Sequence, residues 1–211
     1  MSLACFAVNW PNLITLSRVP ALFAVVGLMF ADFRGAATAA FVVFVLGGAS
    51  DWLDGYLARR YHIVSNFGKL MDALTDKVLV VGVMIAMLVP LPGARGALLQ
   101  DWALFLVLVI FSREFLITGL RLVAASQGLV LAAERTGKIK TVLQLVSVSV
   151  LLLAHALFVD FNLTDAAHNA HTTGLWLFSA AAALTAFSGA GYLVKYWSMF
   201  TGRPGSGPEK P

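Results

Sequence analysis

The chain has 211 residues, of which 59% are hydrophobic and 12% charged, and its mean hydropathy is +0.83. A soluble domain of this length cannot bury so much apolar surface in one core, so the composition excludes an ordinary soluble protein and favours a polytopic α-helical membrane protein. The net charge is +4, but the basic residues cluster beside apolar segments, where anionic lipid and membrane orientation explain them, so nucleic acid is not an expected partner.

Six apolar segments recur along the chain, each near the ~20 residues that a helix needs to cross a bilayer. We therefore expect an all-α protein with six transmembrane helices. A short interfacial segment opens the first helix, because Trp10 supplies an aromatic anchor and Pro11 a helix start. The predicted spans are residues 13–31, 36–58, 70–90, 97–123, 139–159 and 174–199.

Two of the segments outside these spans have a distinctive composition. The residues after Asp160 form a predicted polar loop on the outer face, and this loop holds His168 and His171 without building a site. The C-terminal residues 202–211 are rich in Gly and Pro and are expected to be disordered, which leaves residues 1–201 as one membrane domain.

The distribution of positive charge predicts the orientation. With the N-terminus in the cytoplasm, every Lys and Arg except Arg34 and Arg95 lies on the cytoplasmic side. Cytoplasmic loops carry an excess of Lys and Arg, so both termini are expected to face the cytoplasm.

Four acidic residues lie inside the second and third predicted spans. Asp51 and Asp54 share a face of one helix by their spacing, and Asp72 and Asp76 share a face of the next. In an antiparallel hairpin with a short loop, Asp51 lies at the depth of Asp76 and Asp54 at the depth of Asp72. The four carboxylates are therefore expected to converge just below the cytoplasmic surface.

Buried like charges are costly, so something positive must lie among these carboxylates. All-oxygen ligands suit hard cations, which favours one or two Mg²⁺ or Mn²⁺ ions, and such ions commonly bridge the oxygens of a diphosphate. The expected chemistry is phosphoryl-type transfer. A cation transporter is the alternative from another class, because intramembrane acids also mark ion pathways.

Small residues accompany the acids. Gly55, Ala58 and Gly68 remove bulk from the same helix faces and would let a nucleotide approach the backbone. Gly47 and Gly48 precede the acids and are interpreted as close-packing positions between helices.

The full pattern D-x2-D-G-x2-A-R-x8-G-x3-D-x3-D, from Asp51 to Asp76, resembles the signature of the CDP-alcohol phosphatidyltransferase family. The resemblance implies a six-helix fold, usually a homodimer, that binds CDP-diacylglycerol and an alcohol acceptor at a cytoplasm-facing metal site. It also implies a single displacement in which the acceptor hydroxyl attacks phosphorus and CMP leaves.

The resemblance assigns roles to the matching positions. Asp51, Asp54, Asp72 and Asp76 would bind metal, and Asp76 would also act as the general base. The residues bordering the CDP group would be Gly55, Ala58, Arg59 and Gly68. Asn12 and Thr15 in the first helix would either contact the nucleotide or cap and anchor that helix.

Other intramembrane charges predict the acceptor. Arg113 and Arg121 share one face of the fourth helix, and Lys138 and Lys140 open the fifth. Four cations beside the acids suit a dianionic phosphate on the acceptor, as in glycerol 3-phosphate. The alternative is that they are ordinary positive-inside anchors. Glu114 is expected to form an ion pair with Arg18, Arg113 or Arg121.

Three further segments are similar to bacterial members of the family that use glycerol 3-phosphate: residues 11–18, 112–121 and 137–144. The expected setting is therefore a bacterial cytoplasmic membrane, with phosphatidylglycerophosphate and CMP as products. Within the family, a cardiolipin synthase or a phosphatidylinositol-phosphate synthase is the alternative, because these enzymes differ in the acceptor.

Overall fold

The structure is a computed structural model that describes residues 10–61, 66–94, 96–126 and 135–195. Within these ranges the side chains of residues 10–16, 50–61, 66–74, 76, 126, 135–138 and 195 are not described. Of the expected interfacial start at residues 9–12, the structure describes the backbone of residues 10–12, and the expected disordered tail at 202–211 lies outside the described residues.

The described residues form six α-helices, as the apolar segments predict. Their bounds are α1 Trp10–Met29, α2 Ala36–Tyr61, α3 Asn66–Ala86, α4 Ala103–Ser126, α5 Arg135–Val159 and α6 Thr164–Lys195.

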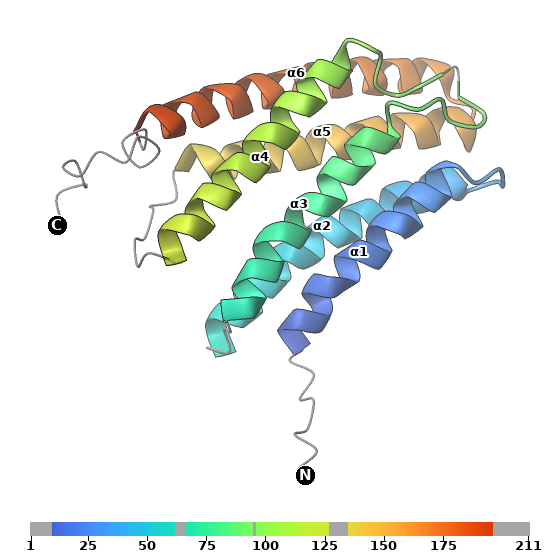
Figure 1. The fold of residues 1–211 in the computed structure, drawn as a ribbon. Helices are drawn as coiled ribbons and strands as arrows, with labels where there is room; N and C mark the ends of the chain where they lie inside the picture. The colour runs from blue at the N-terminus through green and yellow to red at the C-terminus, as the bar shows by residue number, and fades with distance from the viewer. Residues whose placement is uncertain (1–9, 62–65, 95, 127–134, 196–211) are drawn as a thin grey trace.

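The helices alternate in direction along the chain (Figure 1). The ends of α2, α4 and α6 and the starts of α1, α3 and α5 therefore lie at one end of the bundle, which we call the signature end because it carries the D-x2-D motif. The α1–α2, α3–α4 and α5–α6 connections lie at the opposite end, which we call the turn end.

Helix α1 packs against α2 and α3, α2 packs against α5, and α5 and α6 form the most extensive helix pair. Helix α4 packs against α6 and α3. The six helices thus form one bundle, in which α5 packs between α2 of the α1–α2 pair and α6.

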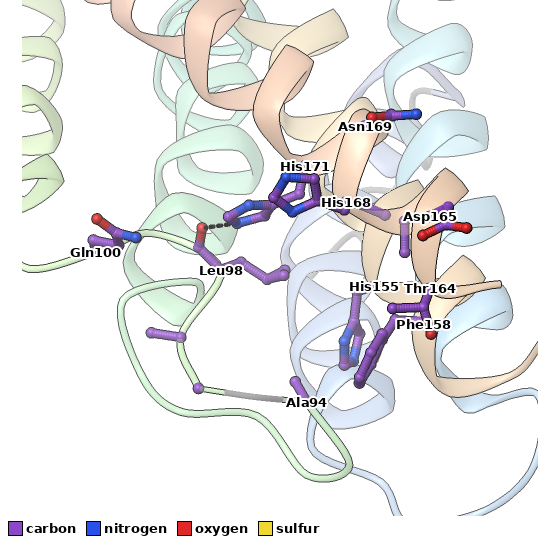
Figure 2. A pocket seen from close by; sticks show the side chains of 14 residues that line it. Ala94, Leu98, Gln100, His155, Phe158, Thr164, Asp165, His168, Asn169 and His171 are labelled. Atoms are coloured by element: carbon purple, nitrogen blue, oxygen red, sulfur yellow. Dashed lines mark hydrogen bonds between the residues drawn. The ribbon is translucent and has the colours of Figure 1, made fainter. Parts of the chain in front are cut away.

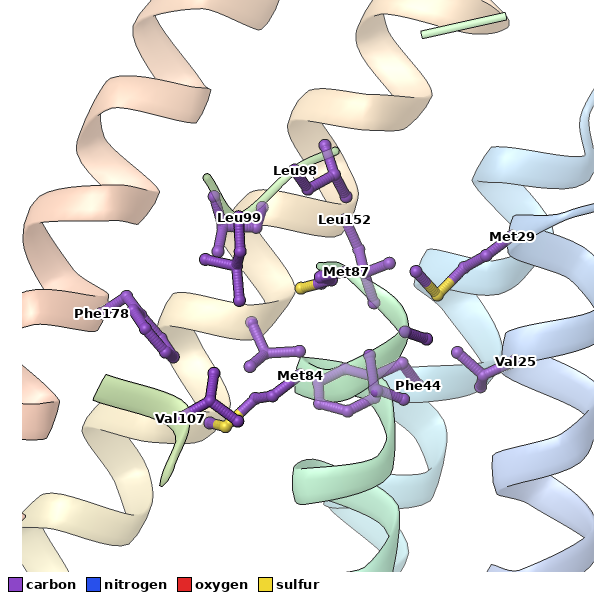
Figure 3. Packing of buried hydrophobic residues seen from close by; sticks show 14 of the residues in the cluster. Val25, Met29, Phe44, Met84, Met87, Leu98, Leu99, Val107, Leu152 and Phe178 are labelled. Carbon is purple, nitrogen blue, oxygen red and sulfur yellow. The ribbon is translucent and has the colours of Figure 1, made fainter. Parts of the chain in front are cut away.

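A large apolar core fills the bundle and takes side chains from all six helices (Figure 3). Phe44, Met84, Met87, Leu152 and Phe178 have no exposed side-chain surface. Met84 of α3 and Met87, which directly follows the last residue of α3, place flexible thioethers in the space beside Phe44 and Leu152. This core holds the helices in register on the turn-end side of the signature.

Large apolar side chains also cover the outside of the bundle. Phe187 is 80% exposed, Trp176 75% and Phe105 71%. Within the described residues, three helical stretches are long and apolar enough to cross a membrane, namely Ala103–Ala125, Ile139–Val159 and Thr164–Val194. Shorter apolar stretches lie in α1, α2 and α3. Lipid, rather than water, is the solvent that such a surface requires.

Glycines allow neighbouring helices to approach closely. A Cβ added at Gly48 would lie 2.7 Å from Leu145 of α5, and one at Gly47 would lie 3.1 Å from Leu79 of α3. A Cβ at Gly82 would lie 2.6 Å from Leu22 of α1. The interpretation of Gly47 and Gly48 as close-packing positions is therefore confirmed.

Asp160 ties the C-terminal end of α5 to the start of α2. Its carboxylate accepts hydrogen bonds from the backbone N–H of Gly35 at 2.8 Å, the N–H of Thr38 at 2.7 Å and the Thr38 hydroxyl at 2.6 Å. Gly35 has φ of +90°, which only glycine adopts without strain. An acid at a helix N-terminus satisfies unpaired N–H groups and complements the helix dipole.

Two predicted boundaries are wrong. The polar loop expected after Asp160 is instead the start of α6, which begins at Thr164 and includes His168 and His171. Asp165 lies in the first turn of this helix, where a negative charge is favourable. The fourth helix begins at Ala103 rather than at residue 97, because residues 87–94 and 96–102 form turns, bends and irregular backbone around Pro90 and Pro92.

Candidate active site

The signature residues lie at the signature end on two consecutive helices. Asp51 and Asp54 belong to the last turns of α2, and Asp72 and Asp76 belong to the first turns of α3. Figure 1 shows the end of α2 and the start of α3 close together. The side chains of these acids are outside the described set, so their convergence remains a prediction, as do the expected roles of the other signature residues: Gly55, Ala58, Arg59 and Gly68.

A cluster of charged side chains lies between α4 and α5. Glu114 of α4 is 7% exposed, and Lys140 of α5 is 3% exposed. The Lys140 ammonium donates a hydrogen bond to Oε1 of Glu114. The same oxygen accepts a hydrogen bond from Nη1 of Arg113 at 3.2 Å. The expected pairing of Glu114 with Arg113 is confirmed, and Lys140 is a second partner that the sequence analysis does not identify.

Helix α6 contributes a polar face to this cluster. Nη2 of Arg113 donates to the Ser188 hydroxyl at 3.1 Å. Nε of Arg121 donates to the Tyr192 hydroxyl at 3.4 Å, and its guanidinium lies 5.4 Å from the centre of the Tyr192 ring. Thr185, one turn earlier, accepts a hydrogen bond from Gln144 of α5 at 3.0 Å.

The charges of this group suit an anion. Among the side chains that the structure describes, Arg113, Arg121 and Lys140 are cations and Glu114 is the carboxylate that Arg113 and Lys140 contact, so these four residues together carry a net charge of +2. Arg113 keeps 14% of its side-chain surface accessible, and Arg121 is an exposed residue. The two arginines can therefore meet a ligand, whereas Lys140 is enclosed beside Glu114.

The contribution of α6 to this cluster was not predicted from the sequence. Thr185, Ser188, Gly189 and Tyr192 follow i, i+3, i+4 and i+7 spacing, which places them on one helix face. A run of hydroxyl-bearing and small residues at that spacing inside an apolar helix is the signal that identifies such a face. The predicted ligands Asn12, Thr15 and Lys138 lie in α1 and α5, and their side chains are outside the described set.

A second polar region lies at the turn end. A cavity of about 610 Å³ is lined by residues of the α3–α4 connection, α5 and α6, including His155, His168 and His171 (Figure 2). Nε2 of His171 donates to the backbone carbonyl of Leu98 at 2.9 Å. In the part of the chain that the structure describes, no group of three or more His, Cys, Asp or Glu side chains could hold a metal ion.

An all-helical apolar bundle with an acid-rich signature at one end and a cation cluster at the same end defines a multi-pass membrane protein with a site for anionic phosphate chemistry. Residues 8–187 match the family model described as CDP-alcohol phosphatidyltransferase. The chain belongs to the CDP-alcohol phosphatidyltransferase family, and it is therefore a phosphatidyltransferase of phospholipid biosynthesis.

Three relatives share one enzyme name. The chain is similar to the CDP-diacylglycerol–glycerol-3-phosphate 3-phosphatidyltransferase of Bacillus subtilis (strain 168), with 38% identity over 203 residues, covering 90% of this chain and 95% of the relative. The Rickettsia typhi enzyme of that name is 33% identical over 145 residues, covering 69% and 76% of the two chains. The chloroplastic/mitochondrial enzyme 1 of Arabidopsis thaliana is 31% identical over 195 residues, which cover 90% of this chain and 63% of the relative.

Proposed function

We propose that the chain transfers the phosphatidyl group from CDP-diacylglycerol to glycerol 3-phosphate, giving phosphatidylglycerophosphate and CMP. The observation that carries this function is the cation cluster with its net charge of +2 at the end of the bundle that also bears the complete signature. Relatives that cover nine-tenths of the chain have names that state this donor and this acceptor.

The reaction is a single displacement. The acceptor hydroxyl oxygen forms a bond to the phosphorus that bears diacylglycerol, and the bond from that phosphorus to the CMP oxygen breaks. Asp76 takes the hydroxyl proton, since a carboxylate within hydrogen-bond reach of the attacking oxygen can serve as general base. CMP leaves with the electron pair of the broken bond, and Arg59 stabilises its negative charge.

The donor site lies along α2 and α3. Gly55, Ala58 and Gly68 leave room for the nucleotide beside the helix backbones, and Arg59 lies in the same stretch of α2. Asn12 and Thr15 of α1 complete the CDP site, because α1 packs against both α2 and α3.

The four signature carboxylates supply only oxygen ligands, which are the ligands that Mg²⁺ and Mn²⁺ take in proteins. Two such ions, held by Asp51, Asp54, Asp72 and Asp76, would offset the charge of the diphosphate and of the departing CMP. The divalent ion is thus a resident cofactor of the proposed site.

The acceptor site is formed by α4 and α5, with Arg113 and Arg121 facing the phosphate of glycerol 3-phosphate. A guanidinium group presents paired N–H donors that match two oxygens of a phosphate. Lys138 and Lys140 add positive charge at the start of α5, and Glu114 fixes the Lys140 ammonium beside Arg113.

All six helices cross the bacterial cytoplasmic membrane in this proposal, with a short interfacial segment before α1, and the protein forms a homodimer of the 1–201 domain. Both termini and the active site face the cytoplasm. Membrane-impermeant maleimide labelling tests the orientation after Cys5→Ser removes the native thiol. Arg34→Cys should react in intact cells and Gly202→Cys only after permeabilisation; the reverse pattern would exclude this orientation.

The acceptor is tested by supplying purified protein with CDP-diacylglycerol and, separately, glycerol 3-phosphate, serine, inositol phosphate or phosphatidylglycerol. CMP release should depend on glycerol 3-phosphate and be accompanied by phosphatidylglycerophosphate. Release that ignores glycerol 3-phosphate but follows phosphatidylglycerol or inositol phosphate would assign one of the other family reactions. Absence of CMP release with every acceptor, together with cation flux into vesicles, would assign a transporter.

A further inference from the structure

We propose that the C-terminal helix α6 positions the acceptor-binding arginines, with Ser188 and Gly189 holding Arg113 and Tyr192 holding Arg121. This inference rests on the proposed function and assigns a role to residues outside the signature. The positioning residues act through the two guanidinium groups and do not themselves touch the reacting atoms.

Ser188 fixes the direction of the Arg113 guanidinium. The Ser188 hydroxyl accepts a hydrogen bond from Nη2 of Arg113 at 3.1 Å and donates its own hydrogen to the Thr185 carbonyl at 3.2 Å. On the other side of the guanidinium, Nη1 is bonded to Glu114. Arg113 is thus held between a carboxylate on α4 and a hydroxyl on α6, which restricts the rotamers of a long side chain.

Gly189 provides the space for the Arg113 stem. A Cβ at Gly189 would lie 2.6 Å from Cγ of Arg113 and 3.4 Å from its Nε. Cγ is near the root of the side chain, so a methyl group there would require Arg113 to change rotamer. Glycine at this position is therefore needed for the observed path of Arg113 between α4 and α6.

Tyr192 positions Arg121 in two ways. The tyrosine is 1% exposed and packs with Ile117 of α4, so its ring is fixed. The ring lies under the Arg121 guanidinium at 5.4 Å, and the hydroxyl accepts from Nε at 3.4 Å. A hydrogen bond to Nε leaves the terminal nitrogens of Arg121 as the donors that a phosphate would meet.

The effect should fall on the acceptor and not on the CDP-lipid. Helix α6 packs on α5 and α4, which carry the cations, while the signature acids belong to α2 and α3. Losing the restraint on one long side chain costs binding about 3- to 10-fold, which is the expected size of each KM change.

The experiment compares Gly189→Ala with Gly191→Ala in the holoenzyme with Mg²⁺. Gly191 lies on the same helix, and a Cβ there would meet nothing within 4 Å, so it is the matched control. Gly189→Ala should raise KM for glycerol 3-phosphate by about 10-fold while KM for CDP-diacylglycerol stays at the wild-type value. Gly191→Ala should match wild type in both.

Conservative variants separate positioning from folding. Ser188→Ala and Tyr192→Leu should each raise KM for glycerol 3-phosphate. Ser188→Thr keeps a hydroxyl at this position, so its KM for glycerol 3-phosphate should stay near the wild-type value. Tyr192→Phe keeps the ring under Arg121 and should fall between Tyr192→Leu and wild type. Equal increases in both KM values, or a lower melting temperature without a selective change in the acceptor KM, would overturn the inference.

Direct binding of glycerol 3-phosphate, measured by calorimetry without CDP-lipid, separates this inference from the proposed function. Wild-type protein that binds glycerol 3-phosphate about 10-fold more tightly than Gly189→Ala but releases no CMP would support the role of α6 and refute the proposed reaction. If the wild-type protein turns over glycerol 3-phosphate and all these variants bind glycerol 3-phosphate as tightly as wild type does, the role of α6 is refuted and the proposed reaction stands.

Discussion

Glu114 is the residue around which the described part of the site is organised. It is buried, and its Oε1 receives both Lys140 and Arg113. A buried charge that loses its partner is strongly destabilising, whereas replacing a whole buried pair by apolar groups is often neutral. Glu114 therefore serves the stability of the bundle, and Lys140 is held in place by it.

Replacing Glu114 alone should lower the stability of the protein, because the buried Lys140 depends on its carboxylate. Glu114→Gln leaves the buried Lys140 ammonium without its carboxylate and should destabilise the protein by about 3–5 kcal/mol. The double variant Glu114→Gln/Lys140→Met should recover most of this loss, as measured by thermal unfolding in detergent. Asp32→Asn, at an exposed position of the α1–α2 turn, is the control. A double variant as unstable as the single one would contradict the pairing.

The role of Asp76 is tested by a neutral isostere. Asp76→Asn cannot accept the acceptor proton and should lower kcat by about 10²- to 10⁴-fold, while CDP-diacylglycerol still binds. CMP release and CDP-lipid binding are measured on the same preparation, with Asp101→Asn in an exposed turn as the control. Wild-type turnover in Asp76→Asn would remove this residue as the base.

The contacts of some site residues can be predicted from the sequence, and the contacts of others cannot. The spacing of Arg113 and Arg121 and the proximity of Glu114 in the chain predict a charged group on α4, and the Glu114–Arg113 pair is present. The contacts of Arg113 with Ser188 and of Arg121 with Tyr192 join residues more than 70 positions apart. Such contacts depend on how α4 and α6 cross, which no local pattern encodes.

The existence of the helices can be predicted from local sequence, but some of their boundaries depend on tertiary packing. Apolar segments of near-span length predict all six helices, because hydrophobic length is a local property. The start of α6 is missed by ten residues, since its first turns are polar and extend beyond the apolar stretch. A helix in contact with α5 along much of its length gains stability from packing, which outweighs that polarity.

Close helix packing should make Gly82 sensitive to a methyl group. The added Cβ of Gly82→Ala would lie 2.6 Å from a methyl group of Leu22, so either the Leu22 side chain or the spacing of α1 and α3 must change, which should destabilise the protein by about 1–3 kcal/mol. In Gly27→Ala the Cβ meets nothing within 4 Å, and that variant should be as stable as wild type or slightly more so. Equal melting temperatures for the two variants would show that α1 and α3 are further apart than described.

The proposed active site and the Asp160 link lie at opposite ends of the bundle. The signature and the cation cluster lie at the signature end, and the turn end is joined by Asp160, which links α5 to the start of α2. Burial raises the pKa of Asp160, but the hydrogen bonds from Thr38 and Gly35 and the nearby His155 outweigh it, so the pKa lies below the usual 3.8.

The Asp160 link gives a pH-dependent stability. Because the folded-state pKa is lowered, the stabilisation is complete well above 3.8 and is lost as the pH falls through the folded-state pKa. The melting temperature of wild type should therefore fall more steeply between about pH 5 and pH 3 than that of Asp160→Asn. Asp32→Asn, an exposed acid in the α1–α2 turn, is the control and should follow wild type. Parallel curves for wild type and Asp160→Asn would contradict the link.

Phosphatidyl transfer by this protein should depend on divalent metal. Purified protein is given CDP-diacylglycerol and glycerol 3-phosphate, and CMP and phosphatidylglycerophosphate are measured before chelation, after chelation and after Mg²⁺ or Mn²⁺ is restored. Because the four signature carboxylates are proposed to hold the ions beside the diphosphate, both products should disappear on chelation and return with the metal. Undiminished product formation after complete removal of divalent metal would show that the four signature carboxylates do not catalyse the transfer through a bound ion.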